Sequence, residues 1–315
     1  MMPLQASIFP SRRRVKDLSR HLFNFANRKS VEMTYKTIAV HVNNSKHLLD
    51  RIQVAAQISI DEAAHLVGVT STATIPASLY LASLTGEGAS VTGAYANVLK
   101  EYALTSLATF EAAAAQAGVP TFEKRMFDQD AGEALCLQSR YSDLLVVGQP
   151  DPKEKVPGEP GDTLHYVLLH SGCPVLVVPC ENAAKTVGER VVIAWNGGAE
   201  AAHAVAAALP LLHKAKHVQV IAFVPEHASD EEVVATGTAD IAAHLSRHGI
   251  VVEICHKRSD DDLETGLELL THVDDTGADL LVMGAYAHSR LRQFLLGGVT
   301  GSVLRFMKVP VLMSR

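Results

Sequence analysis

A group of glycines near the end of the chain has the residue types and spacing of a phosphate-binding loop. Gly284 ends an apolar run over residues 279–283, and Gly297, Gly298 and Thr300 lie at the start of a helical pattern. A loop that leads from a strand into a helix presents several free backbone N–H groups, and these groups attract anions. The segment is therefore expected to bind phosphate.

The spacing of these residues resembles the nucleotide-binding signature of the universal stress protein family. That signature is a glycine, two residues, a glycine, nine residues, a glycine and then Ser or Thr. Gly284 and Gly297 match it, whereas Ala287 replaces the second glycine and Gly298 replaces the hydroxyl residue. The resemblance implies that the ligand is an adenine nucleotide, with ATP as the expected one.

The same resemblance assigns the other site residues. Asn196 and Gly197 follow the first strand of this half, where the family holds the ribose, and an Asn side chain can hydrogen-bond a ribose hydroxyl. The complete set expected to contact the nucleotide is Trp195, Asn196, Gly197, Phe223, Val224, Gly284, Ala287, His288, Ser289, Arg290, Gly297, Gly298, Val299 and Thr300.

Each of these assignments has a structural alternative. Asn196 and Gly197 also suit a plain turn from a strand to a helix. Residues 223–224 equally suit core packing, and the loop that carries His288, Arg290 and Arg292 also suits a solvated loop with incidental basic residues. These alternatives remain open on the sequence alone.

The pattern at the end of the chain also occurs earlier. Residues 143–148 parallel the run that ends at Gly284, and Gly148, Gly161 and Pro174 each lie 136 positions before Gly284, Gly297 and Pro310. An ungapped register across a whole loop and helix indicates a tandem duplication.

The first copy of the loop differs in charge. Asp151 and Asp162 stand where the second copy has Ala287 and Gly298. A carboxylate beside a phosphate costs about 1–4 kcal/mol per pair at intermediate dielectric. Pro150 and Pro152 also remove N–H donors. The first half is therefore expected to hold a degenerate site without nucleotide.

Strand-like and helical runs alternate in both halves, which is typical of a parallel sheet covered by helices on both faces. The expected fold class is α/β, with two tandem open five-stranded parallel-sheet domains of the adenine-nucleotide α-hydrolase-like type. In the second half the expected strands are 191–195, 217–224, 250–256, 279–283 and 309–313, and the expected helices are 199–213, 229–248, 260–276 and 298–307.

The expected domains are residues 34–182 and 183–315, preceded by a basic extension over residues 1–33 that is predicted to be disordered. The first strands, 37–43 and 191–196, are offset by 153 positions rather than 136. The extra residues of the first half are placed in the stretch 70–97, as a longer connection or an added helix.

Composition indicates a cytoplasmic protein with neither nucleic acid nor membrane as partner. The net charge is −6, and no apolar run reaches the roughly 18 residues of a membrane helix. The four cysteines form no Cys-x-x-Cys pair and are expected to be free thiols. No metal site is expected, because His244 and His248 lack a third ligand at a persuasive spacing.

Three functions compete. The first is a stress-response protein that binds ATP in its second domain and acts through conformation or protein partners. The second is a nucleotide-free interaction protein, which Ala287 and Asn196 favour, and the third is a nucleotide hydrolase. No catalytic residues are assigned, because no Walker-type sequence, nucleophile elbow or metal triad is visible.

The last strand of each half is short and apolar, and exposed edges of that kind promote aggregation. Residues 175–178 and 309–313 are therefore expected to pair antiparallel, so that one chain forms an intramolecular pseudo-dimer. A homodimer of tandem chains is compatible with this arrangement.

Overall fold

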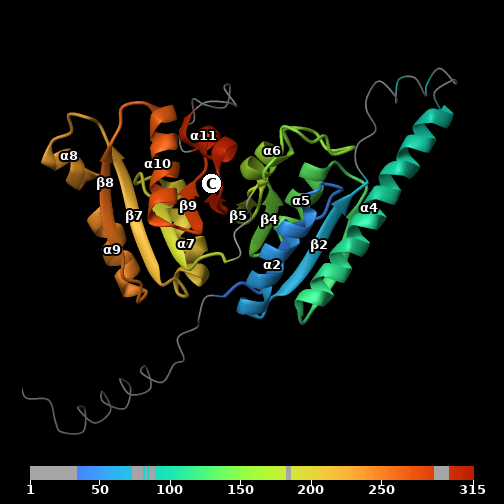
Figure 1. Ribbon diagram of the computed structural model, residues 1–315, viewed down its shortest axis with the longest axis horizontal. Coiled ribbons are helices and arrows are strands. Elements are labelled where there is room, and N and C mark those ends of the chain that lie inside the picture. The colour runs from blue at the N-terminus through green and yellow to red at the C-terminus, as the bar shows by residue number, and fades with distance from the viewer. Residues whose placement is uncertain (1–33, 73–80, 82–83, 85–88, 182–185, 287–297) are drawn as a thin grey trace, which may run out of the picture. The chain divides into compact units, whose positions relative to one another are not determined.

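A computed structural model describes residues 34–72, 81, 84, 89–181, 186–286 and 298–315 (Figure 1). The chain divides into two units, residues 1–34 and 35–315, and all the helices and strands below belong to the second unit. The basic extension over residues 1–33, predicted to be disordered, lies outside the described residues.

The first half of this unit alternates strands with helices. Its strands are β1 (Thr37–His41), β2 (His65–Ser71), β3 (Phe122–Phe127), β4 (Leu144–Gly148) and β5 (Val175–Val178). Its helices are α2 (Leu48–Glu62), α4 (Ala89–Ala117), α5 (Ala131–Ser139) and α6 (Thr163–His170).

The second half follows the same plan. Its strands are β6 (Arg190–Ala194), β7 (His217–Val224), β8 (Glu253–Arg258), β9 (Leu280–Gly284) and β10 (Val311–Ser314). Its helices are α7 (Ala199–Leu212), α8 (Asp230–Ala235), α9 (Thr238–Arg247), α10 (Asp262–Thr276) and α11 (Gly298–Phe306).

The strands form one sheet in the order β3-β2-β1-β4-β5-β10-β9-β6-β7-β8. Within each half every pairing is parallel, so the predicted α/β class with two five-stranded parallel units is confirmed. Each half begins on a central strand, builds outward on one side and then crosses to the other. The two switch points therefore lie between β1 and β4 and between β6 and β9, where open α/β sheets form ligand crevices.

The two halves meet through their last strands. β5 and β10 pair antiparallel, with Val311 opposite Val177 and Leu312 opposite Leu176. The predicted pairing of the final strands is therefore confirmed. It buries both strands and leaves β3 and β8 at the sheet edges, where charged residues such as Lys124 and Arg258 discourage further strand addition.

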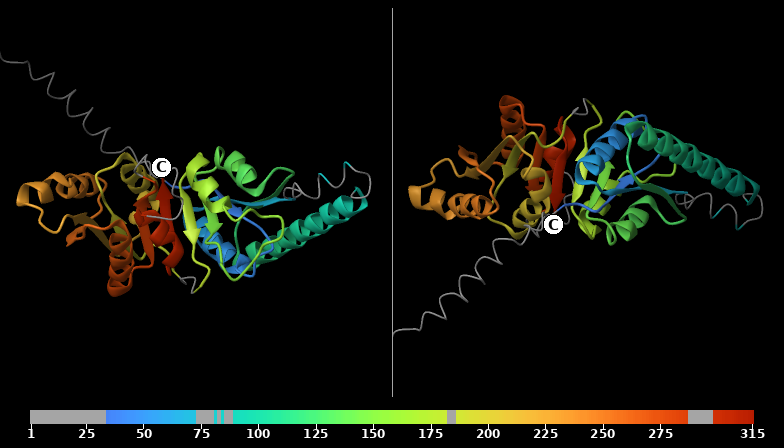
Figure 2. Two further views of the ribbon diagram at one scale, coloured as in Figure 1. Left: turned by 90° about the horizontal axis from the view of Figure 1, so that it is seen from above. Right: turned by 90° about the horizontal axis from the view of Figure 1, so that it is seen from below.

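Alternate strand residues face two separate apolar cores, one on each side of the sheet. Helices cover both faces of the sheet (Figure 2). Ile38 and Val40 pack in the core that α2, α4, α7 and α9 cover, whereas Ala39 packs in the core beneath α5, α6, α10 and α11. Burial on both faces explains why the central strands are almost continuously apolar.

Two predicted elements of the second half differ most from the observed ones. The single helix expected over 229–248 is two helices, because Gly237 adopts a left-handed conformation with φ of +68° between them. The strand expected from residue 250 begins at Glu253, since the N–H of Ile250 still bonds to the Leu245 carbonyl at the end of α9.

The stretch 70–97, predicted as a longer connection or an added helix, is helical at its end, because α4 begins at Ala89 and runs for 29 residues. Within it, residues 73–80, 82–83 and 85–88 lie outside the described part of the chain. In the described part, no helix is both long and apolar enough to cross a membrane.

Candidate functional site

The carboxyl ends of β6 and β9 form the switch point of the second half. Ala194 pairs with Met283 there, and the chain leaves both strands just beyond this pair. The residues after β6 and the residues after β9 therefore reach the same edge of the sheet.

The turn after β6 is held by local hydrogen bonds. The indole Nε1 of Trp195 donates to the Thr236 carbonyl at 2.9 Å, and Asn196 Oδ1 accepts from the N–H of Gly198 at 3.0 Å. Gly197 has φ of +72°, a conformation that favours glycine. Asn196 thus caps its own turn, while its side chain remains exposed.

The two residues expected beside the base differ in access. Val224 is 3% exposed and belongs to the protein interior. Phe223 is half-buried against the core on the other face of the sheet. Successive residues of a strand point to opposite faces, so the pair cannot present one continuous apolar wall to a ligand.

Gly284 packs directly against the first turn of α7, a contact that the sequence did not suggest. A Cβ at this position would lie 2.7 Å from the backbone nitrogen of Ala201 and 2.8 Å from Glu200. The glycine therefore allows the first turn of α7 to pack against the end of β9.

The loop after β9 begins under backbone strain. Tyr286 has φ of +55°, which is uncommon for a residue with a side chain, and its hydroxyl is hydrogen-bonded to Nδ1 of His165 on α6. Its N–H approaches Thr300 Oγ1 at 3.5 Å. The start of the predicted phosphate loop is thus tied both to α11 and to the first half. Burial raises the pKa of the Tyr286 hydroxyl to about 12.

Gly298, Val299 and Thr300 form the first turn of α11, as predicted. Gly298 has φ of +82°, so the Ser or Thr of the family signature would be strained there. The remaining predicted contacts, Ala287, His288, Ser289, Arg290 and Gly297, lie outside the described residues, as does Arg292.

The switch point of the first half holds a cavity of about 370 Å³ between β1 and β4. Polar residues from both strands and from the following loops line it. They include His41, Asn43, Arg51, Asp151, Glu154 and Glu159.

Arg51 is the buried centre of this cavity wall. Its Nε donates to the His41 carbonyl at 2.7 Å, and its Nη2 donates to Asn43 Oδ1 at 2.6 Å. A Cβ at Gly148 would lie 2.3 Å from Nη1, so that glycine makes room for the guanidinium. Burial lowers the pKa of Arg51 to about 10, although Glu159 and Glu154 favour the charge.

His41 is 5% exposed and lies 3.8 Å from Glu159 through Nε2. Burial lowers the pKa of this imidazole to about 4, against the opposing effect of Glu159, and Arg51 lowers it further. The ring is therefore neutral at physiological pH.

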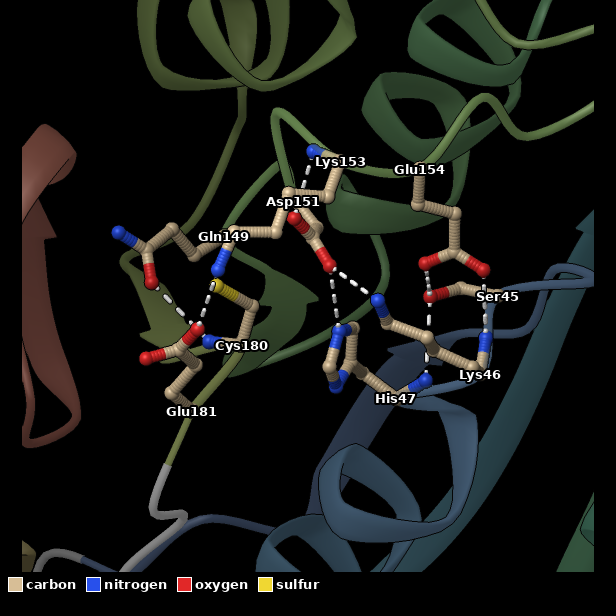
Figure 3. Close-up of polar contacts among 9 residues, drawn as sticks. All are labelled: Ser45, Lys46, His47, Gln149, Asp151, Lys153, Glu154, Cys180 and Glu181. Carbon is tan, nitrogen blue, oxygen red and sulfur yellow. Dashed lines mark hydrogen bonds and ion pairs between the residues drawn. The ribbon is translucent and has the colours of Figure 1, made fainter.

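Asp151 lies at the centre of a second polar cluster at the mouth of the cavity (Figure 3). One carboxylate oxygen, Oδ2, is 2.6 Å from Lys46 Nζ and 3.1 Å from His47 Nε2. The other, Oδ1, accepts the N–H of Lys153 at 2.8 Å. The hydrogen bonds from Lys46, His47 and Lys153 hold the pKa of this carboxyl well below its usual range.

Glu154 completes the cluster. Its Oε2 accepts from Ser45 Oγ at 2.9 Å, and its Oε1 accepts from the Lys46 N–H at 2.8 Å. The loop after β1 is thereby fastened to the loop after β4.

These contacts change the expected account of the first half. Asp151 is predicted to face the phosphate position, and the structure pairs its carboxylate with Lys46 within the cluster. Asp162 is exposed and precedes α6 without a side-chain capping bond. The absence of nucleotide from the first half stays a prediction.

Sequence reasoning missed the residues that fill the first-half cavity. A signal was present in α2, where Arg51 lies among the apolar residues Leu48, Ile52 and Ala55 of the buried face. A charged residue on the buried face of a helix indicates a specific partner or site.

The four cysteines are free, as expected. Burial raises the pKa of the Cys136 thiol to about 11 and that of Cys173 to about 12, so both remain protonated and unreactive at neutral pH.

Two tandem, doubly wound five-stranded units with loops converging at each switch point define a duplicated α/β protein. A model of the universal stress protein family matches residues 34–179 and 188–315. The chain belongs to this family.

Similarity to individual proteins is distant. Universal stress protein Slr1230 of Synechocystis sp. (strain ATCC 27184 / PCC 6803 / Kazusa) is 25% identical over 182 residues, which are 55% of this chain and 58% of that protein. The chain thus matches little more than half the length of this relative.

Two solved structures share the fold over most of the chain. A universal stress protein from Archaeoglobus fulgidus DSM 4304 is 16% identical with a TM-score of 0.67, covering 89% of this chain and 98% of that one. The functionally unknown protein PA1789 from Pseudomonas aeruginosa PAO1 is also 16% identical, with a TM-score of 0.54, covering 88% of this chain and 92% of that one.

Proposed function

We propose that the second half binds an adenine nucleotide, ATP, and that the protein acts in a cytoplasmic stress response through conformation or protein partners. The observation that carries this proposal is the position of α11. Its first turn, from Gly298 to Thr300, follows the glycine loop at the sheet edge where β6 and β9 diverge.

The start of α11 has the electrostatics that a phosphate requires. The first N–H groups of a helix have no acceptor within the helix, and the helix dipole adds partial positive charge there. Gly298 keeps its N–H while its φ of +82° suits a residue without a side chain. Its replacement of the family's hydroxyl residue is therefore compatible with an anion site.

The residues expected to contact the ribose offer fewer free polar groups than the start of α11 offers to the phosphate. Asn196 uses its Oδ1 in the turn, but its exposed amide group remains available to a ribose hydroxyl. Trp195 is fixed by its bond to Thr236 and forms a rigid flank of the turn. No residue is assigned a catalytic role, and binding rather than hydrolysis is proposed.

A nucleotide-free interaction protein is the second candidate. Specific observations favour it: Gly284 is explained by its packing on α7, Asn196 by its own turn, and Val224 by burial in the interior. Each of these residues then has a structural role that needs no ligand.

The two candidates are separated by the small molecules that the protein carries. Protein purified without added nucleotide is denatured, and the released molecules are identified by mass spectrometry. Near-stoichiometric adenine nucleotide supports the proposal, whereas its absence together with no heat of ATP binding in calorimetric titration supports the interaction protein.

A matched pair of variants tests the position of the phosphate. Gly297→Val places a β-branched side chain in the second loop and is expected to lower ATP affinity at least about tenfold, because the phosphate needs close backbone approach. Gly161→Val is its counterpart in the first loop, where an added Cβ meets nothing within 4 Å. Calorimetry is expected to show wild-type affinity for Gly161→Val, and equal affinities in both variants would refute the assignment.

A further inference from the structure

The polar cluster at the mouth of the first-half cavity contains three side chains of the types that hold transition metals. The nearest ligand atoms of His47, Asp151 and Glu154 all lie within 4.8 Å of one another. They come from two loops, one after β1 and one after β4, which meet at the switch point (Figure 3).

We propose that His47, Asp151 and Glu154 bind a divalent first-row transition-metal ion of the Zn²⁺ type. The site belongs to the first half and does not depend on the nucleotide proposed for the second. It would complete its coordination with water.

The spacing of the first two ligands fits a shared ion. His47 Nε2 and Asp151 Oδ2 are 3.1 Å apart. Two ligands at about 2.1 Å from one ion are separated by about 3.0 Å at an octahedral right angle and about 3.4 Å at a tetrahedral angle. Glu154 offers a carboxylate oxygen within 4.8 Å of the ligand atoms of His47 and Asp151.

Surrounding hydrogen bonds orient both carboxylates. The Lys153 N–H holds Asp151 Oδ1, which turns Oδ2 toward the imidazole. Ser45 Oγ and the Lys46 N–H hold the two oxygens of Glu154, and each oxygen keeps a second lone pair. Outer contacts of this kind commonly position metal ligands.

A cationic group already lies beside one of the proposed ligands, Asp151. The Lys46 ammonium is 2.6 Å from Asp151 Oδ2, although its side chain is 54% exposed. Two carboxylates and one exposed ammonium leave a surplus of negative charge at this point. A divalent ion would replace the ammonium, which can swing into solvent without burial cost.

The donor set selects the class of ion. One imidazole nitrogen with two carboxylates suits Zn²⁺ and its first-row neighbours, whereas Ca²⁺ and Mg²⁺ prefer oxygen ligands alone. The adjoining cavity of about 370 Å³ is lined by Asp151 and Glu154 and has room for coordinating water.

The test uses the untagged full-length protein and Co²⁺ as a spectroscopic probe. Wild type is expected to develop saturable visible absorption with one equivalent of Co²⁺, to lose it when Zn²⁺ is added, and to be unaffected by excess Mg²⁺. His47→Ala and Asp151→Asn are each expected to weaken Co²⁺ binding at least about tenfold.

His244→Ala is the matched control, because the rings of His244 and His248 lie 4.8 Å apart between centroids at the end of α9 and form the competing histidine pair. This variant is expected to bind as wild type does. Loss of the absorption in His244→Ala, with retention in His47→Ala, would place the ion on α9 and overturn the proposal.

Lys46→Met provides a test in the opposite direction. Lys46 is exposed, so the variant is expected to fold, and removal of the competing ammonium is expected to tighten Co²⁺ binding several-fold. Unchanged or weaker binding would contradict the displacement of Lys46. Thermal melting in EDTA checks that every variant folds, and Zn²⁺ is expected to raise the Tm of wild type but not that of His47→Ala.

Discussion

The two halves of the molecule place a glycine at the same point of the same fold and surround it differently. In the second half the backbone of α7 itself approaches Gly284, with Ala201 N at 2.7 Å from a Cβ built there. In the first half a side chain, Arg51, approaches Gly148 instead. The close neighbour of the glycine is a helix backbone in the second half and a guanidinium in the first.

The length of the preceding connection explains the difference. Six residues, 42–47, join β1 to α2, whereas four residues, 195–198, join β6 to α7. The longer connection brings polar residues such as Asn43 and Lys46 to the site and leaves a cavity that Arg51 borders. Duplicated strands can therefore keep their register while the loops between them decide what the site contains.

The largest expected loss of stability comes from adding a methyl group at Gly284 or at Gly148. Gly284→Ala forces a Cβ against the backbone of α7, and the expected loss of unfolding free energy is about 3 kcal/mol. Gly148→Ala meets the far end of Arg51, which can move, and is expected to cost about 1–2 kcal/mol. Urea unfolding of the two variants measures both values, and a larger loss for Gly148→Ala would contradict the comparison.

The second prediction concerns the pH dependence of the free energy of unfolding. His41 is a buried imidazole in the first half, whereas Ala194 occupies the equivalent place in the second half and does not titrate. The pKa of His41 falls from 6.5 to about 4 on folding, so the unfolded chain takes up a proton first as the pH drops. The free energy of unfolding is therefore unaffected by protonation of His41 above pH 6.5. It falls as the pH drops from 6.5 to 4, by up to about 3 kcal/mol.

The variant His41→Gln is expected to flatten the pH dependence of unfolding free energy within that window. Chemical unfolding at several pH values compares its slope with that of wild type. The same slope in both proteins would show that the first-half imidazole does not carry the effect.

Arg51→Met sharpens the comparison at the guanidinium itself. The variant keeps an aliphatic side chain but leaves the His41 carbonyl and Asn43 Oδ1 without their donor, so the expected loss is about 1–3 kcal/mol. Ala204→Met at the equivalent position of α7 tests whether the second half accepts a long side chain. It is expected to be overpacked and destabilised, because Ala204 is fully buried. Neutral effects of both substitutions in urea unfolding would make the two sites equivalent.

The smallest expected loss of stability comes from removing the hydrogen bond between Tyr286 and His165, which links the two halves. Tyr286→Phe removes the hydroxyl that bonds to His165, at an expected cost of about 1 kcal/mol. A double-mutant cycle with His165→Ala is expected to give a coupling energy of about 0.5–1 kcal/mol. Additive effects would indicate that the contact contributes nothing between the halves.

Much of the fold was predictable from the sequence because the relevant signals are local or repeated. The apolar runs gave the strands, and the register shared by Gly148 and Gly284 revealed the duplication. The pairing of Val311 with Val177 followed from the cost of two exposed apolar edges. The break between α8 and α9 was missed, although Gly237 marked it.

The candidate sites were less predictable because their contacts join distant segments. Asp151 was recognised as a charge at the site, but its partners Lys46 and His47 lie more than a hundred positions earlier. Gly284 was linked to phosphate because glycine permits any close approach, and only the fold shows that α7 makes one.

The sequence by itself determined the α/β class, the duplication and the positions of the loops, since periodicity and spacing are properties of the chain. Only the tertiary structure decided which groups face one another across β1 and β4 or across β6 and β9. The physical reason is that burial and electrostatics depend on distance in space. Two connections that differ by two residues therefore bring different atoms to equivalent glycines.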